Sequence, residues 1–181
     1  MSIGCSYNCA DLPTHEKISC GAFRKGGISS IGILDCDHGI TDFTDAAQYT
    51  AAIAAGNLKL VEPVKANLPE ASEISGPNPV ACGSADILDG FDWTLPWTDY
   101  NVSANNDAFY EALNLRQAYL VWYYCQDEEV RVVQIPVTFV AKLTEPESNK
   151  EKRFYSVVAK WSSAPDDFPV LYTAPAGIFN Q

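Results

Sequence analysis

Apolar and polar residues alternate along several stretches in the second half of the chain, as is typical of antiparallel strands. This alternation predicts half-buried strands over 91–98, 133–143 and 155–161. Residues 118–125 are instead apolar at nearly every position, which predicts a central strand that is covered on both faces. We therefore expect a set of antiparallel pairs in this half of the protein.

Polar segments separate the last three of these strands. Residues 126–129 predict a hairpin turn, and residues 145–152 predict a longer, charged hairpin loop. Pro136 stands inside the strand predicted over 133–143. Because proline has no amide hydrogen to donate, it indicates either an edge or a bulge at that point.

The first half of the chain is less regular. Strands are predicted over 28–34 and over 58–64, the second ended by Pro63. The alanine-rich stretch 42–56 predicts a helix with Thr44 as its N-cap and Gly56 as its stop.

Two further segments complete the prediction. Residues 66–85 contain three prolines and two glycines, which predict a long loop of the kind that is functional or ordered by a partner. Residues 105–116 predict a short helix capped by Asn105 or Asn106.

This order of elements predicts a mainly β fold, an antiparallel β-sandwich or barrel with one or two short helices and long loops. We expect one domain over 1–181, with an irregular N-terminal segment over 1–30 and an extended C-terminal arm over 164–181. No stretch reaches the roughly 18 apolar residues of a membrane helix, and the N-terminus has no export-signal pattern.

Charge is unevenly distributed. The 181 residues include 12 basic and 23 acidic ones, a formal net charge of −11. Residues 35–128 carry fifteen of the acids and only three bases, whereas both flanks are nearly neutral. This balance argues against sequence-specific binding of nucleic acid. It predicts either a strongly negative surface region or acids spread over exposed loops.

Two groups of residues have the types that bind metals or react. Cys5, Cys9, His15 and Cys20 are the ligand types of a zinc site, but they lack a paired C-x2-C knuckle, which favours free thiols. Residues 35–38, Asp-Cys-Asp-His, have the groups for a cation site or a Cys–His pair, without a third orienting group. We therefore expect no catalytic residue, no metal and no cofactor.

Aromatic residues suggest a further alternative. Some of them can form a sugar-stacking platform, although their alternating positions favour the core: Trp93, Trp97, Trp122, Tyr123 and Tyr124. Asn101-Val-Ser103 matches the glycosylation tripeptide, which we take as coincidence without an export signal. No glycine-rich phosphate loop precedes a helix, so a nucleotide site is unsupported.

The segment from Phe91 to Trp161 carries a resemblance. It runs through Phe-Asp-Trp-Thr-Leu, Asn-Asp-Ala-Phe-Tyr-Glu-Ala-Leu and Tyr-Leu-Val-Trp-Tyr-Tyr, and it ends in Phe-Tyr-Ser-Val-Val-Ala-Lys-Trp. In the order of its predicted elements and in its residue pattern, it resembles a bacteriophage tail tube protein. The resemblance implies a β-sandwich with a flanking helix that assembles into stacked rings, commonly hexameric, around a DNA conduit.

We therefore expect a virion structural protein of a tailed phage, most simply a tail tube subunit that self-assembles in the host cytoplasm and is not an enzyme. Its partners would be itself and other virion proteins, without a membrane. An acidic lining would keep DNA from adhering, with charge from Asp86, Asp89, Asp92 and Asp99. The alternatives are a capsid auxiliary, collar or tail-terminator protein, a carbohydrate-binding module, and a small hydrolase built on carboxylates.

Overall fold

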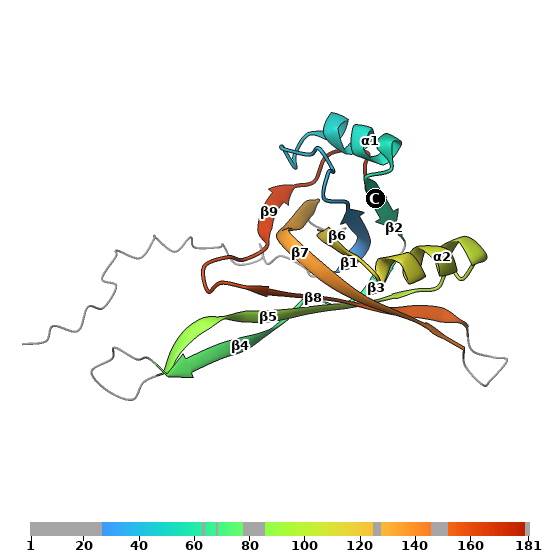
Figure 1. Ribbon diagram of the computed structural model, residues 1–181. Coiled ribbons are helices and arrows are strands. Elements are labelled where there is room, and N and C mark those ends of the chain that lie inside the picture. Colours follow the sequence, from blue (N-terminus) through green and yellow to red (C-terminus); the bar gives the residue numbers. More distant parts are fainter. Residues whose placement is uncertain are drawn as a thin grey trace, which may run out of the picture.

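A computed structural model of the chain describes residues 27–62, 64–67, 69–77, 86–124, 128–145 and 152–179. These residues form antiparallel strands and two short helices, which confirms the predicted mainly β fold class (Figure 1). The helices are α1 (Ala46–Ala55) and α2 (Ala104–Leu113). The strands are β1 (Ile28–Leu34), β2 (Leu58–Val61), β3 (Lys65–Ala66), β4 (Glu70–Pro77), β5 (Asp86–Asp99), β6 (Gln117–Tyr124), β7 (Glu129–Thr144), β8 (Phe154–Ser163) and β9 (Val170–Thr173).

Six of the strands close into a barrel. They pair in the order β1, β3, β5, β8, β7 and β6, and β6 pairs again with β1. Strands β2, β4 and β9 extend the sheet from β1, β5 and β7 respectively. Of the two architectures that the sequence left open, the structure is therefore the barrel.

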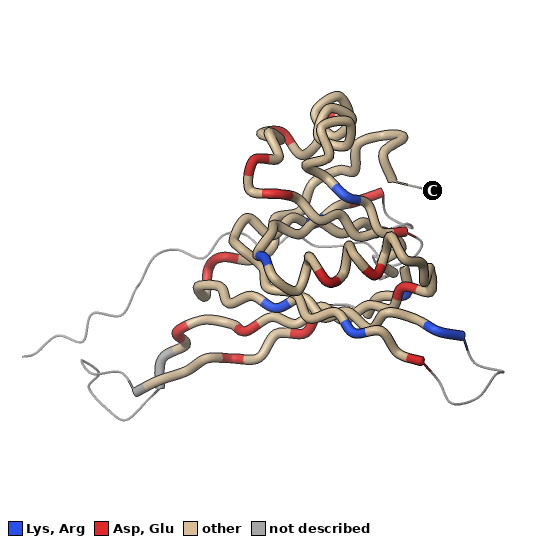
Figure 2. Tube along the Cα trace, turned by 45° about the vertical axis from the view of Figure 1, so that its right-hand side comes forward, with Lys and Arg blue, Asp and Glu red and all other residues tan. Residues whose placement is uncertain are grey.

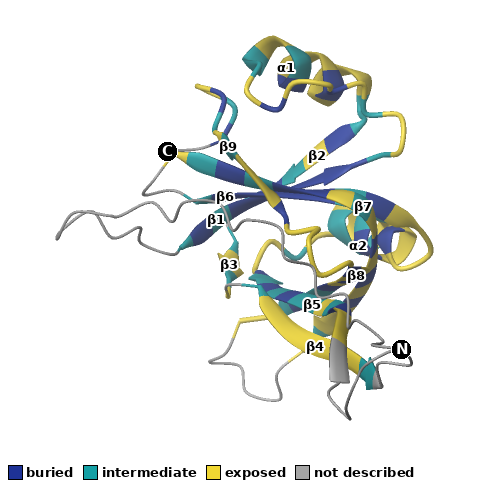
Figure 3. Ribbon diagram, turned by 90° about the vertical axis from the view of Figure 1, so that its left-hand side faces the viewer, coloured by how far each residue is buried: buried dark blue, intermediate teal, exposed yellow. Residues whose placement is uncertain are grey.

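One part of the barrel is buried on both faces. It consists of β1, β6 and residues 129–133 of β7, and we call it the covered half (Figure 3). Leu120 and Trp122 of β6 face the barrel interior, whereas Val121 and Tyr123 lie in a second apolar cluster together with residues of α1. The nearly continuous apolar run of β6 supplies both faces, as predicted.

Helix α1 begins one residue later than the sequence suggested. The N-cap is Asp45, whose Oδ1 accepts from the amide of Ala47 at 2.8 Å. The Thr44 hydroxyl instead donates to Asp42 at 2.7 Å, which explains why it does not cap the helix. Gly56 ends α1 with a φ of 78°, a left-handed conformation that favours glycine, so this stop signal is confirmed.

Helix α2 is capped by Ser103 and not by Asn105 or Asn106. The hydroxyl of Ser103 accepts from the amide of Asn106 at 3.2 Å. The side chain of Asn106 donates to the carbonyl of Asn101 at 2.6 Å, which fixes the loop that enters the helix. The serine of the glycosylation tripeptide therefore has a local structural role.

The long loop predicted over 66–85 is in part a strand. Strand β4 pairs with β5 from Glu70 to Pro77, and β5 starts at Asp86, before the predicted 91–98. A register shift after Ile74 marks a bulge in this pair. All residues of β4 from Glu70 to Ser75 are exposed, so no buried face imposes an apolar alternation that sequence analysis can detect.

Strand β7 changes partners at Pro136. Its first part pairs with β9, and residues 138–144 pair with β8. The register with β6 jumps between the pairs Ala118–Val137 and Leu120–Val133, so of the edge or bulge predicted at Pro136 the structure has the bulge. This bulge separates the part of β7 in the covered half from the part that continues into a more exposed sheet.

The C-terminal residues do not form an extended arm. Strand β9 pairs with β7, and Phe179 is buried against Tyr123 with ring centroids 5.0 Å apart. The apolar side chains of this segment complete the second cluster of the covered half. The expectation of an arm that reaches a neighbour is therefore wrong for residues up to Phe179, because these side chains find their apolar partners within the same chain.

Candidate functional site

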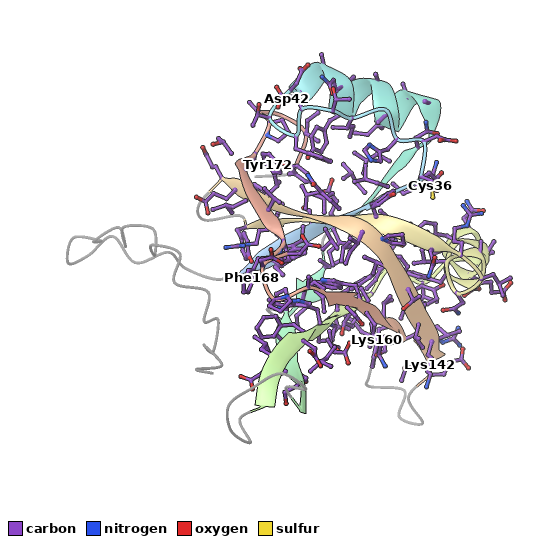
Figure 4. All side chains as sticks on the ribbon, turned by 60° about the vertical axis from the view of Figure 1, so that its left-hand side comes forward. Cys36, Asp42, Lys142, Lys160, Phe168 and Tyr172 are labelled. Atoms are coloured by element: carbon purple, nitrogen blue, oxygen red, sulfur yellow. The ribbon has the colours of Figure 1, made fainter. Side chains whose placement is uncertain are left out.

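The residues of the Asp-Cys-Asp-His motif do not converge on a reactive centre. Cys36 is exposed (Figure 4). Asp35 lies 3.5 Å from Arg116 at the surface. The ring of His38 packs against Phe43 and Tyr119, and its Nδ1 accepts from the Ile40 amide at 3.0 Å. Burial lowers the pKa of His38, so the neutral imidazole is favoured as a packing group.

No metal-ligand set is found in the described part of the chain. Within it, no group of three or more His, Cys, Asp or Glu side chains is placed to hold an ion. The four residues of the candidate zinc site, Cys5, Cys9, His15 and Cys20, lie outside the described residues. None of the described helices is long and apolar enough to cross a membrane.

The aromatic residues mostly form the core. Trp97 and Trp122 are buried in the barrel interior, and Tyr123 is buried in the second cluster. The half-buried Trp93 stacks on Trp161 with ring centroids 5.9 Å apart, and its Nε1 donates to Ser163 at 2.9 Å. The prediction that these aromatic positions belong to the core is confirmed, and a flat platform of several tryptophans is not present among them.

The buried carboxylate of Asp99 helps to hold α2 on the barrel. One of its oxygens accepts from the Tyr110 hydroxyl at 2.8 Å, and the other accepts from the Asn101 amide at 2.8 Å. Next to this pair, Tyr155 donates to Asp107 at 2.6 Å. Burial and the hydrogen bond to Asp107 raise the pKa of Tyr155 to about 12. Asp99 is therefore a structural residue and does not contribute charge to an exposed lining.

A groove of about 470 Å³ between β2 and α2 is lined by some of the same residues. Asp99 and Tyr110 face it while bonded to each other, and Glu62 accepts from the hydroxyl of Ser30 at 2.7 Å. These bonds join a strand or a helix to its neighbour. The polar side chains of the groove thus fix the fold and do not form an arrangement of acid, base and nucleophile.

The acidic residues of the block 35–128 are spread over the molecule (Figure 2). Some lie around α1, others on α2, and others on β4 and β5. Asp89 and Asp92 are exposed on β5. The block in the sequence therefore does not fold into one continuous acidic face.

The remaining part of the barrel differs from the buried regions described above. Strands β4, β5 and β8 with residues 137–144 of β7 form what we call the open sheet. Its inner face belongs to the barrel core, whereas no described side chain of its outer face is buried. Across β5, β8 and β7, the outer rows are Thr94–Lys160–Thr138, Pro96–Val158–Val140 and Thr98–Ser156–Lys142.

Strand β4 is the most exposed element of the open sheet (Figure 3). In the described part of the chain its only strand partner is β5, and its residues 70–75 are exposed on both faces. Beyond Glu73, β4 forms a two-stranded ribbon with residues 86–90 of β5, and such a ribbon in water is only marginally stable. Its free edge also carries backbone donors and acceptors that can pair with another chain.

The opposite side of the open sheet is protected. The side-chain amide of Asn114 donates to the Ala141 carbonyl at 3.0 Å and accepts from the Ala141 amide at 2.6 Å. This pair of bonds replaces a neighbouring strand at the free edge of β7. No pattern in the sequence marks Asn114 for this role, because it depends on two segments 27 residues apart.

Comparison with known proteins adds one structural similarity. Neither a protein-family model nor a curated protein sequence matches the chain. Among solved structures, a chain in the tail of an empty GTA particle, computed with helical refinement and C6 symmetry, is 9% identical. That alignment covers 81% of this chain and 96% of the other, with a TM-score of 0.41. Similarity at this level does not establish a function.

Proposed function

We propose that this protein is a structural subunit of a phage virion, specifically a tail tube subunit that works by self-assembly and not by catalysis. The observation that carries the proposal is the open sheet, whose outer face has no buried side chain among the described residues and whose strand β4 is exposed on both faces over residues 70–75. A sheet with an exposed long edge is usually protected or paired with another chain. Because β7 is protected by Asn114, β4 is the edge of this sheet that is available to a neighbouring copy.

In this proposal the outer face of the open sheet lines the conduit. Hydroxyl groups, Pro96, Val140 and Val158 occupy much of this face. It also carries Lys142 and Lys160, with Asp92 exposed beside Ser162. The lining is therefore mixed, and not acidic as the sequence suggested. DNA would adhere only weakly to this lining, because many of its contacts are neutral and because the whole subunit has a net charge of −11.

Microscopy of the purified full chain tests this function. We expect rings or tubes in negative stain, and a large species by size-exclusion chromatography with light scattering. Rings that never stack would instead favour a collar or tail-terminator protein. A strictly monomeric species at high concentration, with tryptophan fluorescence quenched by sugars, would overturn the proposal in favour of a carbohydrate-binding module.

A variant of β4 makes the test specific. Glu73→Pro removes a backbone donor from the exposed strand, where proline also disturbs pairing. We expect the variant to remain folded, because no residue of β4 from Glu70 to Ser75 is buried, but to assemble poorly. The control is Ala108→Ser, which changes an exposed residue of α2 without touching β4. Unchanged assembly of the Glu73→Pro variant would contradict the role of β4.

A further inference from the structure

The two ends of the open sheet differ in charge. Strand β5 runs the length of the sheet from Asp86 to Asp99, roughly 43 Å at about 3.3 Å per residue. The β4–β5 pair lies at one end, and the end of β7 with the start of β8 lies at the other (Figures 1 and 2). The two ends therefore lie far apart in one subunit.

The first end, which we call the acidic end, combines carboxylates with exposed apolar side chains. It consists of Glu73, Ile74, Leu88, Asp89, Asp166, Asp167 and Phe168, all exposed. Phe168 is 52% exposed, and it reaches this end by packing on Phe91 and Trp93 with ring centroids 5.6 and 5.9 Å away. No lysine or arginine occurs among these described segments of β4, β5 and the turn after β8.

The second end, which we call the basic end, has the opposite charge. It consists of Tyr100, Lys142, Leu143, Glu145, Lys152 and Arg153, again all exposed. Arg153 and Glu145 approach to 3.5 Å, which leaves Lys142 and Lys152 as the excess charge among the described residues of this end. Tyr100 is 52% and Leu143 is 44% exposed, and Tyr100 packs on Phe154 with ring centroids 5.8 Å apart. Figure 4 shows Lys142 and Phe168 on opposite sides of the molecule.

From this arrangement we infer that the acidic end of one copy binds the basic end of the next, in a head-to-tail contact between two copies of this chain. Each end offers apolar side chains within a rim of charge, as protein interfaces commonly do. The charges are complementary only in this orientation, since two acidic ends or two basic ends would repel each other.

Such a contact joins different surfaces on the two partners, so it is heterologous and can be repeated. In the tube it would connect one ring to the next along the strand direction, and in this respect the inference rests on the proposed function. The contact between two copies can nevertheless be tested without a tube.

Zero-length cross-linking of the full chain tests the contact directly. A carbodiimide joins a carboxylate to a lysine only when the two touch. In one subunit, Glu73 is paired with Phe91 of β5. Lys142 is paired with Ser156, which lies opposite Thr98 of the same strand β5. Glu73 and Lys142 are therefore roughly 23 Å apart along the sheet. Any peptide linking Glu73 or Asp89 to Lys142 or Lys152 must therefore come from two copies. We expect such peptides in the dimer band, and their absence would overturn the inference.

Charge reversal provides a second measurement. One variant carries Glu73→Lys and Asp89→Lys, and the other carries Lys142→Glu and Lys152→Glu. Each alone should associate at least about tenfold more weakly, because like charges then face each other. An equimolar mixture should restore association, since every contact in it again joins opposite charges. Thermal melts followed by circular dichroism check that both variants are folded.

The outcomes separate this contact from the proposed function. Rings or tubes that form without end-to-end cross-links, and that tolerate both reversals, would overturn the contact and leave the function standing. End-to-end cross-links in a protein that forms neither rings nor tubes would support the contact and overturn the function. Failure of the mixture to restore association would also contradict the head-to-tail pairing.

Discussion

The covered half and the open sheet belong to the same barrel but differ in how many of their faces are covered. In the covered half, Val130 and Val132 of β7 lie in one apolar cluster and Val133 lies in the other. Beyond Pro136 the same strand alternates, with Phe139 buried and Val140 43% exposed. One face of the sheet has lost its cover at that point. The difference shows that the number of covering layers, and not strand propensity, sets the pattern of side chains.

Truncation of aliphatic side chains in the two regions should give the largest contrast. Leu120→Ala removes a fully buried side chain from the covered half and should destabilise the protein by about 2–5 kcal/mol. Ile74→Ala, the matched change in β4, should cost less than about 0.5 kcal/mol because the side chain is exposed. Urea unfolding followed by circular dichroism measures both, and equal losses would contradict the distinction.

A glycine at the start of the open sheet gives the next largest effect. A Cβ atom at Gly90 would collide with the backbone carbonyl of Ser163, where β5 passes the end of β8. Gly90→Val should therefore destabilise the protein by about 1–3 kcal/mol, which thermal unfolding can measure. Gly27→Val is the control, because a Cβ there meets no atom within 4 Å. A neutral Gly90→Val variant would mean that β5 and β8 are not in close contact.

Removal of the edge protection should have a smaller effect on stability. Asn114→Ala deprives both backbone groups of Ala141 of their partner, at a cost of about 1–2 kcal/mol. It also exposes the edge of β7, so we expect association that rises with protein concentration. Chemical unfolding and light scattering measure the two effects. The control is Asn105→Ala, at an exposed position of α2, which should change neither stability nor association. An Asn114→Ala variant with unchanged stability and association would contradict the protective role of Asn114.

The smallest expected effect concerns His38, which packs against Tyr119 of the covered half. Its pKa is lowered in the folded protein by burial, so folding favours the neutral ring. The stability that follows is complete above the ordinary pKa of histidine, near 6.5, and is lost as the pH falls below it. The unfolding free energy of the wild type should therefore decline more between pH 7 and pH 5 than that of His38→Gln. Identical pH profiles would contradict this.

Much of the fold was predictable because burial leaves a trace in the sequence. The strand over 28–34 has the predicted bounds, and the apolar run of β6 correctly indicated burial on both faces. Pro136 marked the bulge of β7 through the missing amide hydrogen. These features depend on residues that are close together in the chain.

The features missed by the sequence analysis depend on residues far apart in the chain or on the lack of a buried face. Strand β4 has no buried face, so its polar residues resemble a loop until β5 pairs with them. The C-terminal segment resembled a free arm because its binding surface, which includes Tyr123, is built from other strands. The acidic block likewise became several separate groups once the chain folded.

The sequence by itself therefore determined the β class, most strand positions, the helix stop at Gly56 and the excess of negative charge. Only the tertiary structure decided that the sheet closes into a barrel, that Asp99 is buried and that Asn114 protects an edge. The physical reason is that periodicity and backbone chemistry act within a few residues. Closure, burial of a carboxylate and the separation of charge to two ends arise from contacts between segments far apart in the chain.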